Sequence, residues 1–172
     1  MVRDRQFFIG RYVDILRKKG YHRVEEYALY GECLWSKLKT LPMGYCHGDV
    51  YCGNLRRAEG GKLYMLDFDT SCKGFPMYDA TLICDATEYF RYDEENLARS
   101  DRLLERFLPE YGRYSHFTQA EIGAFHALIA MQHFSTQATI VELFGPDCLR
   151  DEDIDGQLEW LYRWREQCKL CE

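Results

Sequence analysis

The residues best suited to chemistry lie together in segment 44–69, which reads GYCHGDVYCGNLRRAEGGKLYMLDFD. A polar loop between two short apolar strands carries Asp49 and, five residues later, Asn54. A glycine-rich turn at residues 59–61 then reverses the chain, and the next strand ends at Asp67. The turn predicts a hairpin that returns Asp67 to the loop, so that two carboxylates and one amide oxygen converge.

This combination of side chains suits phosphoryl transfer. Mg²⁺ prefers oxygen ligands and is usually held by one or two carboxylates together with substrate phosphates. Asn54 and Asp67 are therefore the candidate magnesium ligands. Asp49 is the candidate catalytic base, because a further carboxylate must orient the attacking hydroxyl and accept its proton. The simpler alternatives are a turn-forming Asp49, a loop cap at Asn54 and a solvated charge at Asp67.

The motifs HGDVYCGN and LDFD, followed by GFPMYDAT, resemble the aminoglycoside phosphotransferase and choline kinase family, whose fold is like that of the protein kinases. The elements of the family pattern occur in order over residues 44–85. The resemblance implies an ATP- and Mg²⁺-dependent kinase that acts on a hydroxyl group of a small molecule. Implied acceptors include aminoglycosides, choline or ethanolamine, homoserine and sugars, and the sequence does not choose among them.

Four further residues of the matched region are expected to support the site. We expect the His47 imidazole to bond backbone and hold the loop, and Gly48 to adopt a backbone angle that a side chain would forbid. Asp69 has two open interpretations, assistance through a water molecule or support of the loop. Asp79 is expected to cap its own helix.

Length and composition limit the other possibilities. The 172 residues, 47% apolar and 29% charged, are typical of a single globular domain over residues 1–172. Neither a membrane-span-length apolar run nor a signal core after Met1 is present, so we expect a cytoplasmic protein with no membrane partner. The net charge of −6 argues against a nucleic-acid partner and would suit a cationic substrate, although surplus acid usually serves solubility.

The eight cysteines show no metal-site spacing. The one CxxC pair, Cys168 and Cys171, lies at the C-terminal end, where we expect a frayed surface pair. Most of the others lie in apolar stretches and are expected to be small buried hydrophobic side chains. A reducing cytoplasm is the default environment without a signal sequence.

Hydrophobic periodicity predicts the elements that position the site. The expected fold class is α+β, predominantly α-helical, resembling the C-terminal lobe of a protein-kinase-like fold with the N-terminal lobe absent. Residues 1–43 read as helical, residues 70–77 as a loop, and no glycine-rich phosphate loop occurs. Strands are expected at 43–46, 55–58 and 62–66, and helices at 4–19, 23–39, 79–89, 94–108 (ended by Pro109), 118–143 (with a Thr118–Glu121 capping box) and 153–168.

Two groups outside the motif segment have both a functional and a structural interpretation. Aromatic side chains can line a substrate pocket but more often form core; these are Phe125, Phe134, Trp160 and Trp164. Acidic side chains can hold a cationic amine but also favour the first turn of a helix; these are Asp151, Glu152, Asp153, Asp155 and Glu159. His126 and His133 are expected to be satisfied core histidines.

Three hypotheses remain open. The first is the phosphotransferase, and the second is a non-catalytic kinase-like binding or interaction module that lacks the nucleotide clamp. The third, a metal-dependent hydrolase using Asp49, Asp67 and Asp69, ranks last because such sites often add histidine ligands. An exposed apolar surface on the His-Gly-Asp side would point to a truncated enzyme that lacks its N-terminal lobe, since the whole enzyme should cover that face, and association through it would give a homodimer.

Overall fold

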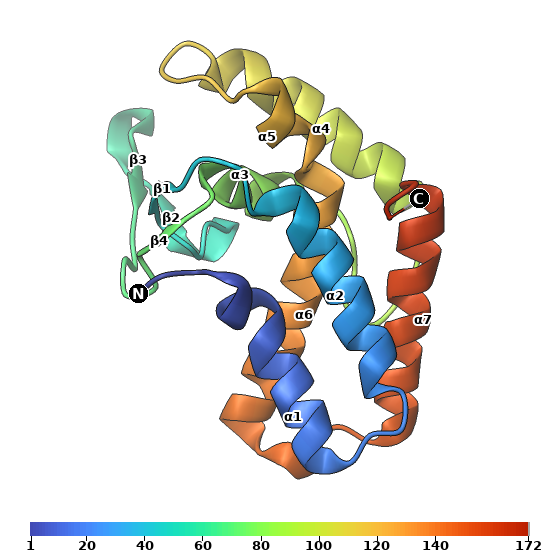
Figure 1. Ribbon diagram of the computed structural model, residues 1–172. Helices are drawn as coiled ribbons and strands as arrows, with labels where there is room; N and C mark the ends of the chain where they lie inside the picture. The colour runs from blue at the N-terminus through green and yellow to red at the C-terminus, as the bar shows by residue number, and fades with distance from the viewer. Residues whose placement is uncertain (172) are drawn as a thin grey trace.

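The computed structural model describes residues 1–171, and most of this chain is helical (Figure 1). The helices are α1 (Arg11–Lys19), α2 (Val24–Leu38), α3 (Pro76–Cys84), α4 (Glu95–Tyr111), α5 (Gln119–Gly123), α6 (Phe125–Phe144) and α7 (Asp151–Gln167). A π-helical turn, Gln6–Gly10, leads into α1. Within the described chain, none of the helices is both long and apolar enough to cross a membrane. The predominance of helix with a few short strands agrees with the expected fold class.

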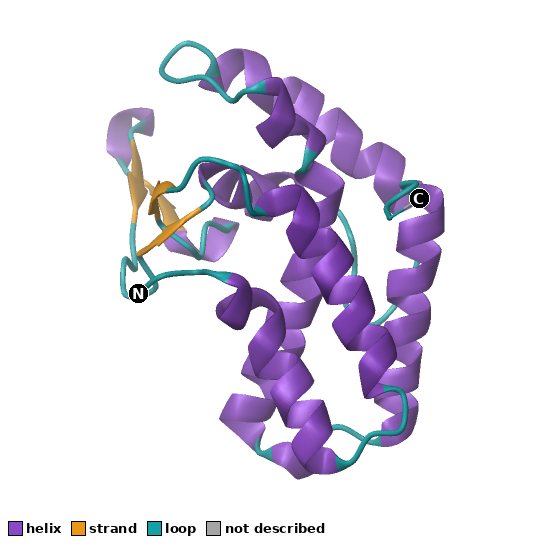
Figure 2. Ribbon diagram, in the orientation of Figure 1, coloured by secondary structure: helices purple, strands orange, loops and turns teal. Residues whose placement is uncertain are grey.

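The strands form two antiparallel pairs at one side of the helical body (Figure 2). Strand β1 (Gly44–Cys46) pairs with β4 (Cys72–Gly74), and β2 (Leu55–Arg57) pairs with β3 (Leu63–Met65). The β2–β3 pair is the expected hairpin. The expectation of a loop over residues 70–77 is wrong, because Cys72 and Gly74 face inward and give the backbone of β1 a hydrogen-bonding partner.

Helix α6 is the centre of the core. Its residues 127–131 are all fully buried, as expected for a helix that is apolar around its whole circumference. Helices α1, α2 and α3 pack against it. The aromatic residues with two interpretations all belong to the core: Phe125, Phe134, Trp160 and Trp164.

Three helix boundaries differ from the expected ones. Helix α3 begins at Pro76 and ends at Cys84. Beyond it the Asp85 carboxylate accepts a hydrogen bond from Thr87 N, and the resulting local turn replaces a further turn of helix. Pro109 lies inside α4, which continues because Gly112 N donates to Leu108 O. The expected helix 118–143 is divided at residue 124 into α5 and α6, and the predicted capping box at the start of α5 is confirmed.

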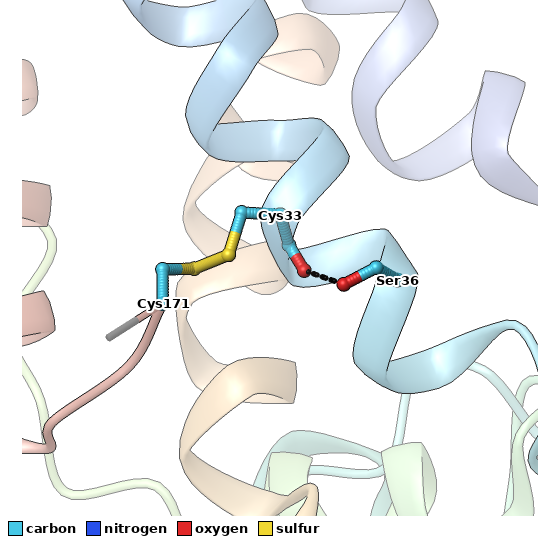
Figure 3. The surroundings of a disulfide bond; sticks show 3 residues. All are labelled: Cys33, Ser36 and Cys171. Carbon is cyan, nitrogen blue, oxygen red and sulfur yellow. Dashed lines mark hydrogen bonds between the residues drawn. A yellow bond between two sulfur atoms is a disulfide. The ribbon is translucent and has the colours of Figure 1, made fainter.

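A disulfide joins Cys33 of α2 to Cys171 beyond α7, with the two Cα atoms 5.9 Å apart (Figure 3). The expectation of a frayed Cys168–Cys171 pair is therefore wrong. The turn that follows α7, in which Lys169 N donates to Glu166 O, carries Cys171 back to α2. Free thiols that are buried, as expected of small hydrophobic side chains, belong to Cys46, Cys72 and Cys84.

We predict that Cys33→Ser lowers the free energy of unfolding in oxidising buffer by roughly 2–4 kcal/mol, because the crosslink restricts the unfolded chain. The two cysteines are 138 residues apart in sequence. Urea unfolding with and without a reductant measures the effect, and the parent should match the variant once reduced. Cys148→Ser, which changes an exposed free thiol, is the matched control. Equal stability of Cys33→Ser and the parent under oxidising conditions would contradict the crosslink.

His133 of α6 is buried between aromatic rings. Its ring centroid lies 3.6 Å from that of Trp160 and 5.6 Å from that of Tyr89. Its Nε2 lies 3.3 Å from Thr87 Oγ1, whereas Nδ1 has no hydrogen-bond partner among residues 1–171. The expected satisfied histidine is therefore only half satisfied, and burial lowers the pKa of His133 to about 3. His126, by contrast, has its Nε2 2.7 Å from Asp101 Oδ1.

This pKa makes stability depend on pH. Between about pH 6.5 and pH 3 the unfolded state binds a proton at His133 that the folded state does not, so stability falls as the pH falls through this range. We predict that His133→Phe, which keeps an aromatic ring, reduces the slope of unfolding free energy against pH by up to about 1.4 kcal/mol per pH unit. Chemical denaturation between pH 6 and pH 4 measures the slope. His116→Asn, at an exposed histidine, should leave the slope unchanged; an unchanged slope in His133→Phe would rule out a neutral buried imidazole.

Candidate active site

The loop that contains Asp49 is held by Asp79 of α3. The Asp79 carboxylate accepts hydrogen bonds from His47 N at 2.7 Å and from Gly48 N at 2.8 Å. The expectation that Asp79 caps its own helix is wrong. Helix α3 begins at Pro76, and proline has no N–H group that would need a hydrogen-bond acceptor at the start of the helix. The Asp79 carboxylate makes no cap bond in its own helix and binds the neighbouring loop instead.

His47 fastens this loop to the hairpin. Its Nε2 donates to Leu66 O at 3.0 Å, and its Nδ1 accepts from Asp49 N at 3.3 Å. Both ring nitrogens of His47 are therefore engaged with backbone. Thr70 Oγ1 donates to His47 O at 3.1 Å, and the side chain is buried. His47 therefore lies in the site as a backbone-binding residue.

Gly48 lies where a larger residue does not fit. Its φ is +87°, in the left-handed region that favours glycine. A Cβ at this position would lie 2.7 Å from Thr70 O and 2.9 Å from Arg3 Nη2. The turn at Gly48 directs two successive N–H groups toward Asp79 and leaves Asp49 at the tip of the loop.

Asp49 and Asn54 contact one another directly. Asn54 Nδ2 donates to Asp49 Oδ2 and to Asp49 O, both at 2.9 Å. Asn54 is buried at the end of a short 3₁₀ turn, and Asp49 is half-buried. The amide nitrogen thus fixes the carboxylate, and the Asn54 carbonyl oxygen remains as a ligand atom.

Asp67 and Asp69 lie at the open side of the site. Asp67 follows Leu66, whose N donates to Asn54 O at 2.9 Å, so the hairpin does return Asp67 to the Asn54 segment. Its φ of +62° is uncommon for a residue with a side chain, and such strained positions concentrate at functional sites. Both carboxylates are exposed.

The candidate ligand atoms of Asn54 and Asp67 suit Mg²⁺, which takes few protein ligands, better than they suit a metal ion that is held by protein ligands alone. An amide oxygen at Asn54 and a carboxylate at Asp67 are the few hard ligands that Mg²⁺ takes when phosphates and water complete its shell. Among the described residues, no group of three His, Cys, Asp or Glu side chains is placed to hold a metal.

A cavity of about 400 Å³ opens beside Asp49. One wall is a polar stripe on α6 formed by Gln132, Ser135, Thr136 and Thr139, and the opposite side includes Arg3 and Thr70. A carboxylate at the edge of a cavity can accept a proton from a hydroxyl group bound there. Asn54, Asp67 and Asp69 do not line this cavity.

The acidic residues near the start of α7 lie apart from this cavity. Four of them form ion pairs: Asp151 with Lys19, Glu152 and Asp153 with Arg150, and Asp155 with Arg23. Glu152 and Asp153 line a separate cavity of about 180 Å³, which has no residue in common with the one beside Asp49. The structure therefore does not bring the acidic group to the candidate base.

The sequence matches a known family over residues 4–125, which fit the Phosphotransferase enzyme family. The chain belongs to this family. Its structure is similar to that of a choline/ethanolamine kinase family protein from Mesorhizobium loti, with a TM-score of 0.60 and 20% sequence identity. That match covers 99% of this chain and 55% of the other, so the chain spans little more than half of that relative's length. No curated protein matches the sequence.

Sequence reasoning missed the residues of this phosphotransferase-family chain that line the cavity opposite Asp49. Arg3 belongs to no motif and precedes the first helix, so only its tertiary position identifies it. The α6 residues did carry a signal, because Gln132, Ser135, Thr136 and Thr139 recur at helical spacing along an otherwise apolar helix.

We predict that Asp79→Ala lowers the free energy of unfolding by about 2–4 kcal/mol, because two backbone donors lose a charged acceptor. Asp79→Asn keeps one acceptor oxygen and should lose roughly half as much. Urea unfolding gives the loss, and amide hydrogen exchange at His47 and Gly48 should accelerate specifically. Asp69→Ala, at an exposed carboxylate, is the control. Slow exchange at both amides in Asp79→Ala would show that this carboxylate does not hold the loop.

Proposed function

We propose that this chain is the C-terminal catalytic lobe of an ATP- and Mg²⁺-dependent phosphotransferase that acts on a hydroxyl group of a small molecule. The observation that carries the proposal is the Asp49–Asn54 pair, fixed by Asp79 and placed at the edge of a cavity that has a polar stripe of α6 along one wall. Membership of the Phosphotransferase enzyme family supports the reaction class.

Asp49 is the proposed base. Its Oδ2 is occupied by the Asn54 amide, whereas Oδ1 accepts no hydrogen bond from the described side chains and backbone. An acceptor hydroxyl in the cavity donates its proton to Oδ1 as the oxygen attacks the phosphoryl group. Because both Asn54 and Asp79 hold the loop, the carboxylate is positioned before the substrate arrives.

Asn54 Oδ1 and the Asp67 carboxylate are the proposed magnesium ligands, and Asp69 assists through a water molecule or supports the loop. When bound there, Mg²⁺ would supply positive charge that offsets the negative charge developing during phosphoryl transfer. The buried Asn54 orients one ligand atom through its two bonds to Asp49. The exposed Asp67 supplies the charge.

The side of the site formed by the hairpin carries exposed apolar side chains, which supports the proposal that another domain or chain covers it. Seven large apolar or aromatic residues on this side are between 41% and 74% exposed: Tyr45, Tyr51, Leu63, Tyr64, Met65, Leu66 and Phe68. A contiguous apolar surface of this kind is typical of an interaction site. We propose that an N-terminal lobe, or a second copy of the chain, covers it and completes the nucleotide site. The same surface favours the second candidate function, a kinase-like interaction module without catalysis.

We predict that Asp49→Asn lowers kcat by about 10²–10⁴-fold, since the general base is lost while the side-chain shape is kept. The assay measures ADP formation from Mg·ATP with a panel of small alcohols, amino alcohols, sugars and hydroxy acids. It uses this chain alone and the chain supplied with an N-terminal lobe from a relative. Glu105→Gln, at an exposed carboxylate of α4, is the matched control and should keep most of the activity.

Equal turnover by Asp49→Asn and the parent would remove the base assignment. Mg·ATP binding by calorimetry separates the two candidate functions. Failure to bind or turn over Mg·ATP even with the lobe supplied would favour the interaction module over the kinase.

A further inference from the structure

We infer that the cavity beside Asp49 binds an acceptor that carries an anionic group, a hydroxy acid, with Arg3 as the residue that holds the anion. This inference rests on the proposed function, because it names the substrate class of the same site.

Arg3 is buried in an unusual place for a cation. It is 6% exposed, and its backbone N donates to Lys73 O at 2.9 Å, so the first residues of the chain run along β4. The guanidinium carbon lies 4.6 Å from the ring centroid of Phe7 and 5.2 Å from that of Tyr78. These contacts fix the side chain against the wall of the cavity and offset part of the cost of burying its charge.

The charge of Arg3 has no partner within residues 1–171. No carboxylate lies within ion-pair distance of its guanidinium, and its buried Nε makes no hydrogen bond. The more exposed Arg11 and Arg23, by contrast, pair with Glu142 and Glu26. Because a buried charge is costly unless it is paired, Arg3 marks a position for an anion that the protein itself does not supply.

The position of this anion is close to the candidate base. A Cβ on Gly48 would lie 2.9 Å from Arg3 Nη2, so the guanidinium touches the backbone of the residue before Asp49. Both Arg3 and Asp49 line the 400 Å³ cavity, and among residues 1–171 no other carboxylate lines it. Ser135, Thr136 and Thr139 line the same space and add polar side chains to its α6 wall. A hydroxy acid therefore places its anion on Arg3 and its hydroxyl on Asp49.

Two other occupants fit less well. A nucleotide phosphate is directed to Asn54 and Asp67, which are the proposed metal ligands and do not line this cavity. A cationic acceptor would be repelled by the unpaired guanidinium of Arg3, which lines this cavity. The charge of the cavity thus favours an anionic acceptor over the cationic one that the net charge would suit.

An NMR titration of the full chain with matched small probes tests this inference without nucleotide. The probes are 4-hydroxybutyrate, its neutral counterpart 1,4-butanediol, choline as the cation, and inorganic phosphate. We expect 4-hydroxybutyrate to bind about tenfold or more tightly than the diol, as a charge-assisted pair predicts, with shifts at the amides of Gly48 and Asp49. Arg3→Gln should abolish this preference and Arg3→Lys should retain part of it.

Arg57→Gln, at an exposed arginine of β2, is the control and should bind like the parent, and thermal unfolding verifies that each variant is folded. Equal binding of the acid and the diol, tighter binding of choline, or binding of phosphate without the hydroxy acid would overturn the inference. So would a parent-like preference in Arg3→Gln. The failure of this inference can be distinguished from the failure of the proposed function. Acid-selective binding without phosphoryl transfer would overturn the proposed function alone. Turnover of neutral alcohols without acid selectivity would overturn this inference alone.

Discussion

The two hydrogen bonds that Asp79 accepts from His47 N and Gly48 N are the constraint on which the site depends. Consecutive N–H groups can reach one carboxylate only if the backbone turns sharply, and the positive φ of Gly48 provides that turn. Bonds to a charged acceptor are each worth roughly 1.5–3 kcal/mol, enough to hold an irregular loop against its conformational entropy. Asp79 is in turn fixed because α3 packs on the buried helix α6. The position of Asp49 is thus set by the core through a single carboxylate.

Local sequence patterns identify the parts of this site that are close in sequence. Asp49 and Asn54 lie five residues apart, and the Gly60-Gly61 turn closes the hairpin within a few residues, so their geometry follows from spacing and turn chemistry. The apolar residues on every face of 127–131 likewise identify α6 as the central helix.

The contacts that sequence reasoning missed all join distant segments. The capping rule assigns Asp79 to its own helix, whereas its partners are 31 and 32 residues away. The Cys33–Cys171 bond closes 138 residues, and the pairing of β4 with β1 depends on where the hairpin ends. None of these follows from periodicity or propensity, since those describe a residue's neighbours in sequence and not its neighbours in space.

The two halves of the proposed site differ in how complete they are. The acceptor half is enclosed by α6, the Asp49 loop and the first residues of the chain. The nucleotide half consists of the exposed Asp67 beside the exposed apolar hairpin. Electrostatic contacts are weak in exposed positions and strong where water is excluded, so Asp67 needs a cover before it can hold a magnesium ion and its phosphates effectively. In the proposed kinase, acceptor selection and the base are therefore properties of this chain, whereas nucleotide affinity depends on what covers the hairpin.

The unpaired Arg3 also explains how such a cavity would discriminate between acceptors. A neutral ligand that fills the cavity excludes water from the guanidinium without supplying an anion, so the ligand takes on the cost of an isolated buried charge. A cation adds repulsion to that cost. An anionic ligand removes the cost of the isolated charge. Selectivity therefore comes from weaker binding of neutral and cationic ligands as much as from attraction of the anionic one. Since Asp49 is the other charge in the cavity, the same pair of residues would orient the bound acceptor, with its anion toward Arg3 and its hydroxyl toward the base.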